Sequence, residues 1–379
     1  MLPPCAAKFL FRGGLLKKVG IVTIFDPFAN YGNKLQNYAV RYVLLELGFA
    51  ADTLYVEKQV RFTPLLYGKA AFHRLTHYRL AGDRRFYKTL KKVRKFQKFG
   101  RRYLNPHRIR RFSGLDSQYD FFVLGSDQVW NTAWFDARKK HAFLLTFARP
   151  EQKAAFAPSF GTDRLNDAWR GWFQKYLPTF SHLSVRETSG AALIRDLTGQ
   201  AAEVLVDPTL LLPAPAWRTL AEKPRGVSLE KGYILVYMLG QLSRQERAFL
   251  EQAAGERSLQ IYDLTGGDDR VLLNLSPGEF LYMLDHAALV ATDSFHACVF
   301  SFLFDRPFVV FRRRGAPDDM GTRLDSFLAL FSLRRKRFES LLPSELFASG
   351  YSGLQPVLQR ERQKALRFLR ASLGVSEEA

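Results

Sequence analysis

The chain has 379 residues, of which 47% are hydrophobic and 14% aromatic, and its formal net charge is +20. This length and apolar content predict a folded protein with room for two domains of ordinary size. No stretch approaches the ~20 apolar residues that span a bilayer, and Cys5 and Cys298 indicate neither a disulfide framework nor a metal site. These features favour a soluble cytoplasmic protein, bound to a membrane at most peripherally.

Predicted strands and helices alternate along the first half of the chain. Residues 1–17 are expected to form a loose N-terminus, and residues 19–25 (VGIVTIF) then have the composition of a buried strand. Residues 34–47 are amphipathic and end at Gly48, which is typical of a helix. Further strands are expected at 51–56, 119–124, 153–160, 182–186 and 204–206, and further helices at 168–177 and 189–197. The alternation predicts a Rossmann-like domain over residues 18–212.

A proline-containing stretch, residues 213–231, is expected to link this domain to a second α/β unit over residues 232–345. Strand patterns in the second unit cover 233–239, 259–264, 288–291 and 308–311, and helix patterns cover 244–254, 278–286 and 297–304. Within residues 346–379, an amphipathic helix at 357–369 is expected to pack across the domains rather than to bind a partner. The predicted fold class is α/β, with two Rossmann-like domains facing a cleft.

The positive charge is concentrated in residues 61–115, which hold seventeen Lys or Arg and one acid, Asp83. Apolar residues recur in this segment at helical spacing with basic residues between them, at Phe86, Leu90, Val93, Phe96 and Tyr103. Three interpretations remain open: a solvated helix that packs on its own domain, a helix that contacts an anionic membrane, and a nucleic-acid site. Nucleic acid is least favoured, because no nucleic-acid-binding module is recognisable.

Clusters of polar residues follow several of the predicted strands. They are Asn30, Gly32, Asn33, Gln36 and Asn37; Ser126, Asp127, Gln128 and Asn131; Arg186 with Glu187; Asp207; and Ser294 with His296. Ligands of open α/β sheets bind at the carboxyl ends of the strands, where helix N-termini favour anions. Each cluster alone is equally compatible with a capped turn. Five clusters at equivalent strand ends predict a ligand site, because chance would scatter them along the chain.

Two of these clusters indicate particular chemistry. Residues 30–33 (NYGN) open a predicted helix, so their backbone N–H groups could hold a phosphate or a sugar hydroxyl, although a plain turn remains the alternative. They form neither a Walker loop nor the Gly-x-Gly-x-x-Gly fingerprint. His296 lies in a strand–turn–helix–strand pattern at residues 288–311. It could bind an anionic ligand or exchange protons near neutral pH, or it could merely cover a helix end.

Five blocks of the sequence resemble the polysaccharide pyruvyl transferase family in the family's order: GNKLQNYAV, FFVLGSDQVWN, LSVRE, VDPTLLL and TDSFHACVFSFLFDRPF. The matching segments span residues 18–311, with one departure, since Ala297 and Cys298 follow Ser-Phe-His where the family usually has Gly. The resemblance implies a fold similar to two-domain glycosyltransferases of the GT-B type. It also implies transfer of a pyruvyl group from phosphoenolpyruvate to a sugar diol of an envelope polysaccharide or its lipid-linked precursor. The products would be a pyruvate ketal and phosphate, with no cofactor or metal.

The donor's carboxylate and phosphate require guanidinium groups and helix N-termini. The resemblance makes Arg186 the first candidate to bind the donor. Arg312 and Arg323 are further candidates, although the arginine run that begins at Arg312 could form a solvated loop. His296 is expected to contact the departing phosphate as an acid or an electrostatic stabiliser, and Asp127 to orient or deprotonate the acceptor. The other clustered polar residues are expected to bind substrate.

Two other classes of function remain open. One is a GT-B-type glycosyltransferase that uses a nucleotide sugar, and the other is a non-catalytic protein that binds a sugar or polyanion in an envelope assembly complex. The joint presence of Arg186, Asp127 and His296 argues against the second class, because a decayed site should lose at least one of them. A lipid-linked acceptor would give the basic segment a role in contact with the inner face of the membrane.

Overall fold

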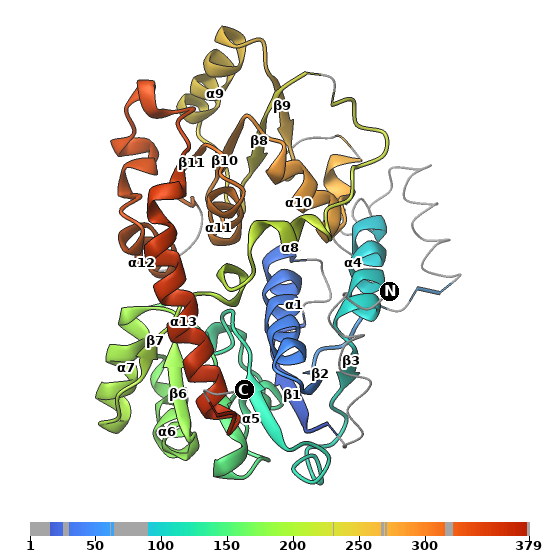
Figure 1. Cartoon of the computed structure of the whole chain (residues 1–379), viewed down its shortest axis with the longest axis vertical. Coiled ribbons are helices and arrows are strands. Elements are labelled where there is room, and N and C mark those ends of the chain that lie inside the picture. The colour runs from blue at the N-terminus through green and yellow to red at the C-terminus, as the bar shows by residue number, and fades with distance from the viewer. Residues whose placement is uncertain are drawn as a thin grey trace.

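The computed structural model describes residues 16–25, 30–60, 62–63, 90–229, 231–266, 269, 271–314 and 321–376. The expectations about residues 1–15 and about residues 64–89 of the basic segment lie outside this part of the chain. Two parallel sheets organise the rest, and each forms one half of the molecule in Figure 1. Because helices flank both sheets, the predicted α/β class with two Rossmann-like domains is confirmed.

The N-terminal sheet has seven strands in the order β3-β2-β1-β4-β5-β6-β7, and all its pairings are parallel. The strands are β1 (Lys18–Val22), β2 (Ala50–Tyr55), β3 (Pro106–Arg108), β4 (Phe121–Leu124), β5 (Lys153–Ala155), β6 (His182–Val185) and β7 (Glu203–Val204). The helices are α1 (Tyr31–Glu46), α4 (Leu90–Tyr103), α5 (Lys139–Phe143), α6 (Asp167–Tyr176) and α7 (Thr188–Thr198). The strand order reverses between β1 and β4, which is where such sheets bind ligands.

The C-terminal sheet has four parallel strands in the order β11-β10-β8-β9. They are β8 (Tyr233–Tyr237), β9 (Gln260–Asp263), β10 (Leu289–Thr292) and β11 (Phe308–Val310). The accompanying helices are α9 (Arg244–Glu256), α10 (Pro277–Asp285), α11 (Phe295–Leu303) and α12 (Thr322–Leu330). In this sheet the strand order reverses between β8 and β10. Its ligand-binding edge faces the corresponding edge of the N-terminal sheet.

The ends of several elements differ from the predicted ones, and two of these differences have a clear local cause. Helix α1 begins at Tyr31 instead of residue 34, because the Asn30 side chain accepts a hydrogen bond from the backbone N–H of Asn33 at 3.1 Å and caps the helix. Strand β5 ends at Ala155 instead of residue 160, because Ala157 has a φ of 50° in the left-handed region, which interrupts a strand. The first difference affects the site, since it moves Gly32 and Asn33 from a loop into a helix.

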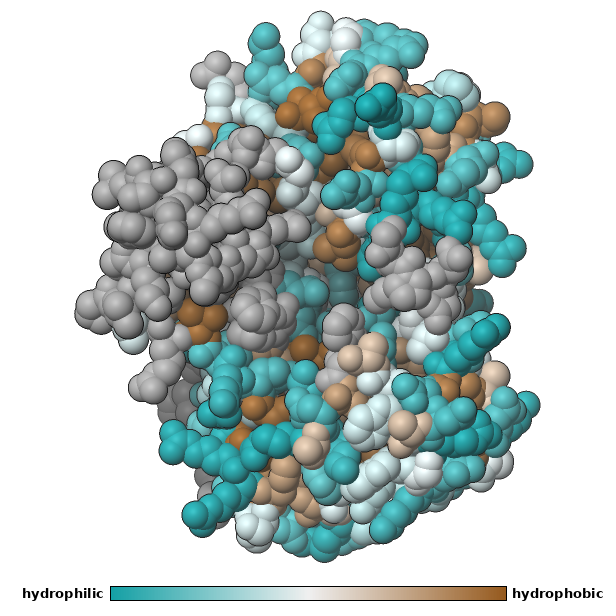
Figure 2. All heavy atoms as spheres, turned by 180° about the vertical axis from the view of Figure 1, so that it is seen from behind, coloured by the Kyte–Doolittle hydropathy of each residue, from teal (hydrophilic) through white to brown (hydrophobic). Residues whose placement is uncertain are grey.

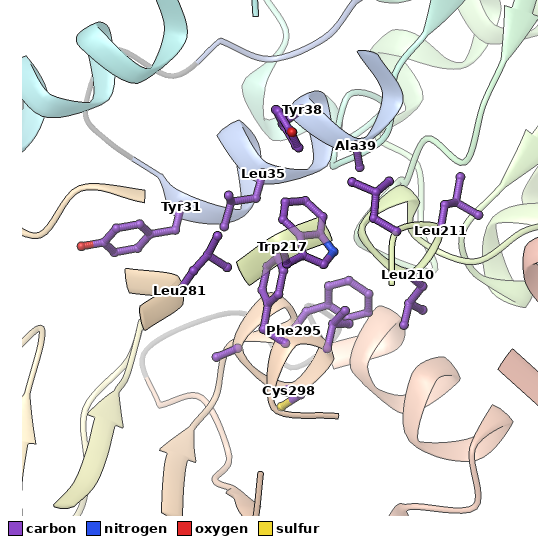
Figure 3. Packing of buried hydrophobic residues seen from close by; sticks show 14 of the residues in the cluster. Tyr31, Leu35, Tyr38, Ala39, Leu210, Leu211, Trp217, Leu281, Phe295 and Cys298 are labelled. Atoms are coloured by element: carbon purple, nitrogen blue, oxygen red, sulfur yellow. The ribbon is translucent and has the colours of Figure 1, made fainter. Parts of the chain in front are cut away.

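The domains are joined through an apolar interface built around the linker helix α8 (Ala214–Arg218). Figure 3 shows Trp217 of α8 between α1 and α11. Its ring centroid lies 5.6 Å from that of Tyr38 in α1 and 4.9 Å from that of Phe300 in α11. Tyr31 stacks on Phe280 of α10 at 4.0 Å. One hydrophobic cluster therefore contains residues of both domains, and it holds them in a defined relation.

The C-terminal helix α13 (Gln355–Ser372) runs from the C-terminal domain back along the N-terminal one (Figure 1). Phe368 stacks on Phe156 at a centroid distance of 6.3 Å. The Arg362 guanidinium donates to the backbone oxygen atoms of Leu210 and Leu212 at 2.6 and 3.0 Å. These bonds fix the chain that follows Asp207. No helix in the described part of the chain is both long enough and apolar enough to cross a membrane.

Candidate active site

A cavity of about 800 Å³ lies between the two domains. Figure 2 shows a recess between the upper and lower halves of the surface. Residues that follow β1, β2, β3 and β4 line the cavity from the N-terminal domain, and residues that follow β8 and β10 line it from the C-terminal domain. The cavity therefore lies at the carboxyl ends of both sheets, and the predicted cleft between the domains is confirmed.

His296 reaches this cavity from the first turn of α11, directly after β10. Its Nε2 lies 3.7 Å from Oδ2 of Asp207, which belongs to the other domain. Gly32, in the first turn of α1, faces the same ring: a Cβ atom at Gly32 would lie 1.9 Å from Nδ1 of His296. Even alanine would therefore displace the imidazole. The N-termini of α1 and α11 thus approach each other at His296, and both favour negative charge there.

Arg186, which follows β6, forms a buried ion pair behind His296. The Nη2 atom of Arg186 lies 2.7 Å from Oδ2 of Asp207 and also donates a hydrogen bond to Oγ of Ser126. The other carboxylate oxygen of Asp207 accepts from the backbone N–H and the hydroxyl of Thr209, at 2.9 and 2.5 Å. Burial alone would raise the pKa of Asp207, but Arg186 and His296 outweigh it and hold that pKa well below its usual range. Asp207 is therefore an anion that pairs with the Arg186 guanidinium and faces the His296 imidazole.

Asp127 and Arg323 form a second ion pair across the domains, with 3.4 Å between Oδ1 and Nη1. Asp127 has a φ of 73°, and its side chain also accepts from the amide of Asn33 at 3.5 Å. Burial raises the pKa of Asp127, but Arg323, His296 and Arg186 together hold it below its usual value. Burial lowers the pKa of Arg323 to about 10, so its guanidinium remains charged at neutral pH.

Several buried polar atoms of this cluster have no hydrogen-bond partner among the described residues. They are Nε and Nη1 of Arg186, Nε of Arg323 and Nε2 of His296. Buried donors without partners are costly, so their presence indicates a site for an anion. Arg186 lines a second cavity of about 380 Å³, and Phe295 and Arg323 line both cavities.

The structure brings most of the predicted site residues together. On the main cavity lie Asn30, Gly32, Asn33, Asp127, Gln128, Ser294, His296 and Arg323. Ser126, Arg186 and Asp207 form the buried network directly behind His296.

Four predicted residues have other positions. Gln36 and Asn37 join α1 to the sheet, through bonds to Thr23 and Thr53 of 3.1 Å each. Asn131 caps a short helical turn by accepting from the N–H of Ala133. Arg312 lies beside a separate cavity of about 450 Å³, because the chain after β11 turns its neighbour Arg313 toward the main one. Asp293 holds Arg313 there, with Nε 3.4 Å from Oδ2.

Several residues on the cavity were not predicted from the sequence. Three aromatic rings from both domains form one wall: Tyr31, Tyr237 and Phe280. Four basic residues of the N-terminal domain lie on the cavity as well: Lys58, Arg108, Arg138 and Lys139. Tyr31 could have been found within the polar cluster at residues 30–33, and Lys58 by its place after a predicted strand. Phe280 gives no local signal, because it reaches the cavity only through the domain interface.

The described residues contain no group of three or more His, Cys, Asp or Glu side chains arranged to hold a metal ion. The groups of the site that can bind an anion are the guanidinium groups, the imidazole and the two helix N-termini.

Comparison with solved structures finds proteins of similar extent and low identity. A UDP-N-acetylglucosamine 2-epimerase shares 11% identity over 96% of this chain and 97% of its own, with a TM-score of 0.46. The UDP-GlcNAc 2-epimerase of Methanocaldococcus jannaschii shares 13%, covering 93% and 99% of the two chains with a TM-score of 0.41. ADP-heptose lps heptosyltransferase II of E. coli shares 12%, covering 96% and 100%, with a TM-score of 0.35.

Comparison with protein families gives a direct match, although no curated protein matches the chain. The model of the polysaccharide pyruvyl transferase family matches residues 30–314, which is more than half of the chain. The matched region begins at the cap of α1 and ends just after β11, so it contains both sides of the cavity. The chain therefore belongs to the polysaccharide pyruvyl transferase family.

Proposed function

We propose that this enzyme transfers a pyruvyl group from phosphoenolpyruvate to two hydroxyl groups of a saccharide, with formation of a ketal and release of phosphate. The observation that carries the proposal is the set of unpartnered buried donors on Arg186, Arg323 and His296. A ligand with two anionic groups would satisfy donors on separate side chains better than a ligand with one. Phosphoenolpyruvate has both a carboxylate and a phosphate.

The donor is proposed to bind where the N-termini of α1 and α11 converge. Arg186 and Arg323 are both within cation–π distance of the Phe295 ring, at 5.2 and 5.8 Å, so the two guanidinium groups flank one side chain. Guanidinium groups bind carboxylate and phosphate through paired, charge-assisted hydrogen bonds. The backbone N–H groups at the start of each helix would add further donors for the phosphate.

The proposed reaction balances without another reactant. Protonation of the donor's methylene carbon forms the methyl group and leaves an oxocarbenium-like centre at C2. One sugar hydroxyl attacks C2, the bond between C2 and the phosphate oxygen breaks, and the second hydroxyl then attacks the same carbon. Of the two hydroxyl protons released, one replaces the proton taken up by the methylene group and the other leaves with phosphate.

His296 and Asp127 are proposed to have different roles in this reaction. His296 would contact the departing phosphate and donate a proton or a hydrogen bond to it, a form of assistance typically worth about 10²–10⁴-fold in rate. The lowered pKa of Asp127 makes it a weak base at neutral pH. Asp127 is therefore better suited to orient an acceptor hydroxyl by accepting its hydrogen bond than to remove its proton completely. The rings of Tyr31, Tyr237 and Phe280 pack on one another beneath the cavity and fix the shape of this wall.

The proposal predicts that phosphoenolpyruvate binds and that saccharides accelerate its breakdown. Calorimetry should show one donor site per chain, and free phosphate should accumulate faster when a mixture of saccharides is added. The same mixture with a UDP-sugar in place of phosphoenolpyruvate tests the glycosyltransferase alternative. Consumption of the UDP-sugar without binding of phosphoenolpyruvate would replace pyruvyl transfer by glycosyl transfer. Saccharide binding without turnover of either donor would favour the binding-protein alternative.

We further propose that the enzyme works at the inner face of an anionic membrane, which the outer side of α4 contacts. The inner side of this helix is buried, and Phe96 packs 5.0 Å from the cavity residue Tyr31. The outer side exposes five basic residues: Lys91, Arg94, Lys98, Arg101 and Arg102. Helix α4 contains no acidic residue, so its outer side has an unbroken positive charge next to the cavity wall.

Co-sedimentation with vesicles that contain phosphatidylserine is expected, and it should weaken as salt is raised. At ~1 kcal/mol per basic residue near the surface, the variant K91Q/R94Q/K98Q/R101Q should bind these vesicles roughly two to three orders of magnitude more weakly. A matched variant that loses four exposed charges elsewhere, R334Q/R335Q/R360Q/R367Q, should bind like the unaltered protein. An equal loss of vesicle binding in both variants would exclude a membrane role for α4, and so would tighter binding of the unaltered protein to duplex DNA than to the vesicles.

A further inference from the structure

Four basic side chains, here called the basic arc, line a part of the cavity that the proposed donor site leaves unused: Lys58, Arg108, Arg138 and Lys139. Lys58 follows β2, Arg108 ends β3, and the other two lie between β4 and β5. Arg138 reaches back toward β3, since its Nη2 donates to the backbone oxygen atoms of Ile109 and Arg110 at 2.7 and 3.3 Å. The basic arc is thus assembled at the β2–β3 edge of the sheet.

The strand order places the basic arc and the donor site on opposite sides of β1. Strands β2 and β3 lie on one side, and β4 to β7 lie on the other. Arg186 follows β6, so at about 4.8 Å per strand its backbone is on the order of 20 Å from that of Arg108. His296 lies between them, against Gly32 after β1. A ligand that spans the cavity would therefore pass the imidazole.

The basic arc keeps an excess of positive charge. Lys58 and Arg108 are exposed, and neither has a carboxylate within ion-pair distance in the described part of the chain. Of the two nearby acids, Asp136 lies 4.0 Å from Nζ of Lys139 and uses its other oxygen atom to cap the backbone of Arg138 and Lys139. The second acid, Glu57, also lines the cavity, so four basic side chains face two acidic ones there. An anionic group on a ligand would neutralise the remaining positive charge of the basic arc.

We propose that the saccharide acceptor carries a phosphate or carboxylate group and that the basic arc binds this group. The inference rests on the proposed function, which assigns both anionic groups of the donor to Arg186, Arg323 and His296 and leaves the basic arc unused. The cavity of about 800 Å³ is in the range that holds drug-sized ligands, so it has room for more than a three-carbon donor. An acceptor held by its anionic group at the basic arc would present its hydroxyl groups toward His296 and Asp127.

Binding of matched sugars tests this inference. With the donor site saturated by phosphoenolpyruvate, calorimetry would compare glucose, galactose and mannose with their 1-phosphates and their uronic acids. The phosphate or the carboxylate form is expected to bind at least about tenfold more tightly than the neutral sugar. R108A and K58A should each remove most of this preference and should leave the affinity for phosphoenolpyruvate unchanged. Tighter binding of the 1-phosphate than of the uronate would identify phosphate as the recognised group, and the reverse order would identify carboxylate.

R110A is the matched control, because Arg110 is an exposed arginine two residues from Arg108 that does not line the cavity. This variant should keep the preference for anionic sugars. Equal affinity for neutral and anionic sugars, or equal losses in R108A and R110A, would overturn the inference. If the proposed function alone is wrong, the result differs: phosphoenolpyruvate would neither bind nor release phosphate, but the preference for anionic sugars would persist. Conversely, pyruvyl transfer that is no faster with anionic than with neutral sugars, and that R108A does not slow with either, would remove the inference alone.

Discussion

Replacement of His296 by alanine is expected to slow phosphate release from phosphoenolpyruvate by about 10²–10⁴-fold. The imidazole lies at the meeting point of two helix N-termini and is the titratable group best placed to act on a departing phosphate. Stability should change little, because Asp207 keeps its 2.7 Å pair with Arg186 when the imidazole is removed. Initial rates with saturating saccharide, together with a thermal unfolding curve, would measure both effects.

H286A provides the matched control, since His286 is an exposed histidine outside the cavity and stacks on Tyr282. It should retain full activity. H296N separates the two proposed roles of the imidazole, because asparagine can donate a hydrogen bond but not a proton. An asparagine variant as slow as H296A would indicate proton donation, and one near the original rate would indicate hydrogen bonding alone. A folded H296A protein with undiminished phosphate release would exclude His296 from the chemistry.

Replacement of Arg186 by methionine is expected to lower the free energy of unfolding by about 3–5 kcal/mol and to abolish donor binding. The stability loss arises because Asp207 is fully buried, and removal of its guanidinium partner leaves an uncompensated charge in the interior. The binding loss arises because Nε and Nη1 of Arg186 are the buried donors proposed to hold the donor's anionic groups. Urea unfolding and calorimetry with phosphoenolpyruvate measure the two effects.

Arg218 offers a comparison within the same chain. It forms two hydrogen bonds to Asp285, of 2.8 and 2.9 Å, but its side chain is 46% exposed. R218M should therefore cost less stability than R186M, because Arg218 is half-exposed and Arg306 remains 3.8 Å from the carboxylate of Asp285, and it should leave donor binding intact. The double variant R186M/D207L should regain stability without regaining binding, because it removes both buried charges. Equal stability losses in R186M and R218M would show that the Arg186–Asp207 pair is not specially dependent on burial.

The same ion pair predicts a dependence on pH. The pKa of Asp207 is lower in the folded protein than in the unfolded chain, so its stabilising contribution is complete above the unfolded value, about 3.9. This contribution is lost as the pH falls through the lower, folded pKa. In R186M, burial without the guanidinium raises that pKa, and protonation relieves the penalty at a higher pH. As the pH falls, the difference in unfolding free energy between the two proteins should therefore begin to narrow above the unfolded pKa, where Asp207 of R186M first takes up a proton.

Much of the fold could be predicted because its signals are local. The apolar runs of β1 and β8 and the amphipathic pattern of α1 are properties of a few consecutive residues. The boundaries were less accurate where one side chain decided them. Because Asn30 caps α1, this helix begins three residues before its predicted start. The left-handed backbone conformation of Ala157 ends the strand that was predicted to reach residue 160.

Much of the candidate site could also be predicted, since polar residues at the ends of successive parallel strands meet at one edge of a sheet. The rule does not distinguish a side chain that enters the cavity from one that packs behind it. Asn33 and Asn37 both lie on α1, but one is on the cavity and the other bonds to Thr53 inside the domain. For the same reason Arg312 was predicted to bind the donor, whereas Arg313 is the arginine that Asp293 holds at the main cavity.

By itself, the sequence determined the α/β class, the alternation of strands and helices, and the chemical types available at the strand ends. Only the tertiary structure decided which of these groups meet. It placed Gly32 against His296, Asp207 between Arg186 and His296, and an arc of basic residues across β1 from them. The physical reason is that strand order and the packing of α1, α8 and α11 bring together residues that are far apart in the sequence, such as Gly32 and His296. Hydrophobic patterns report only which side of each element is buried, not what lies against it.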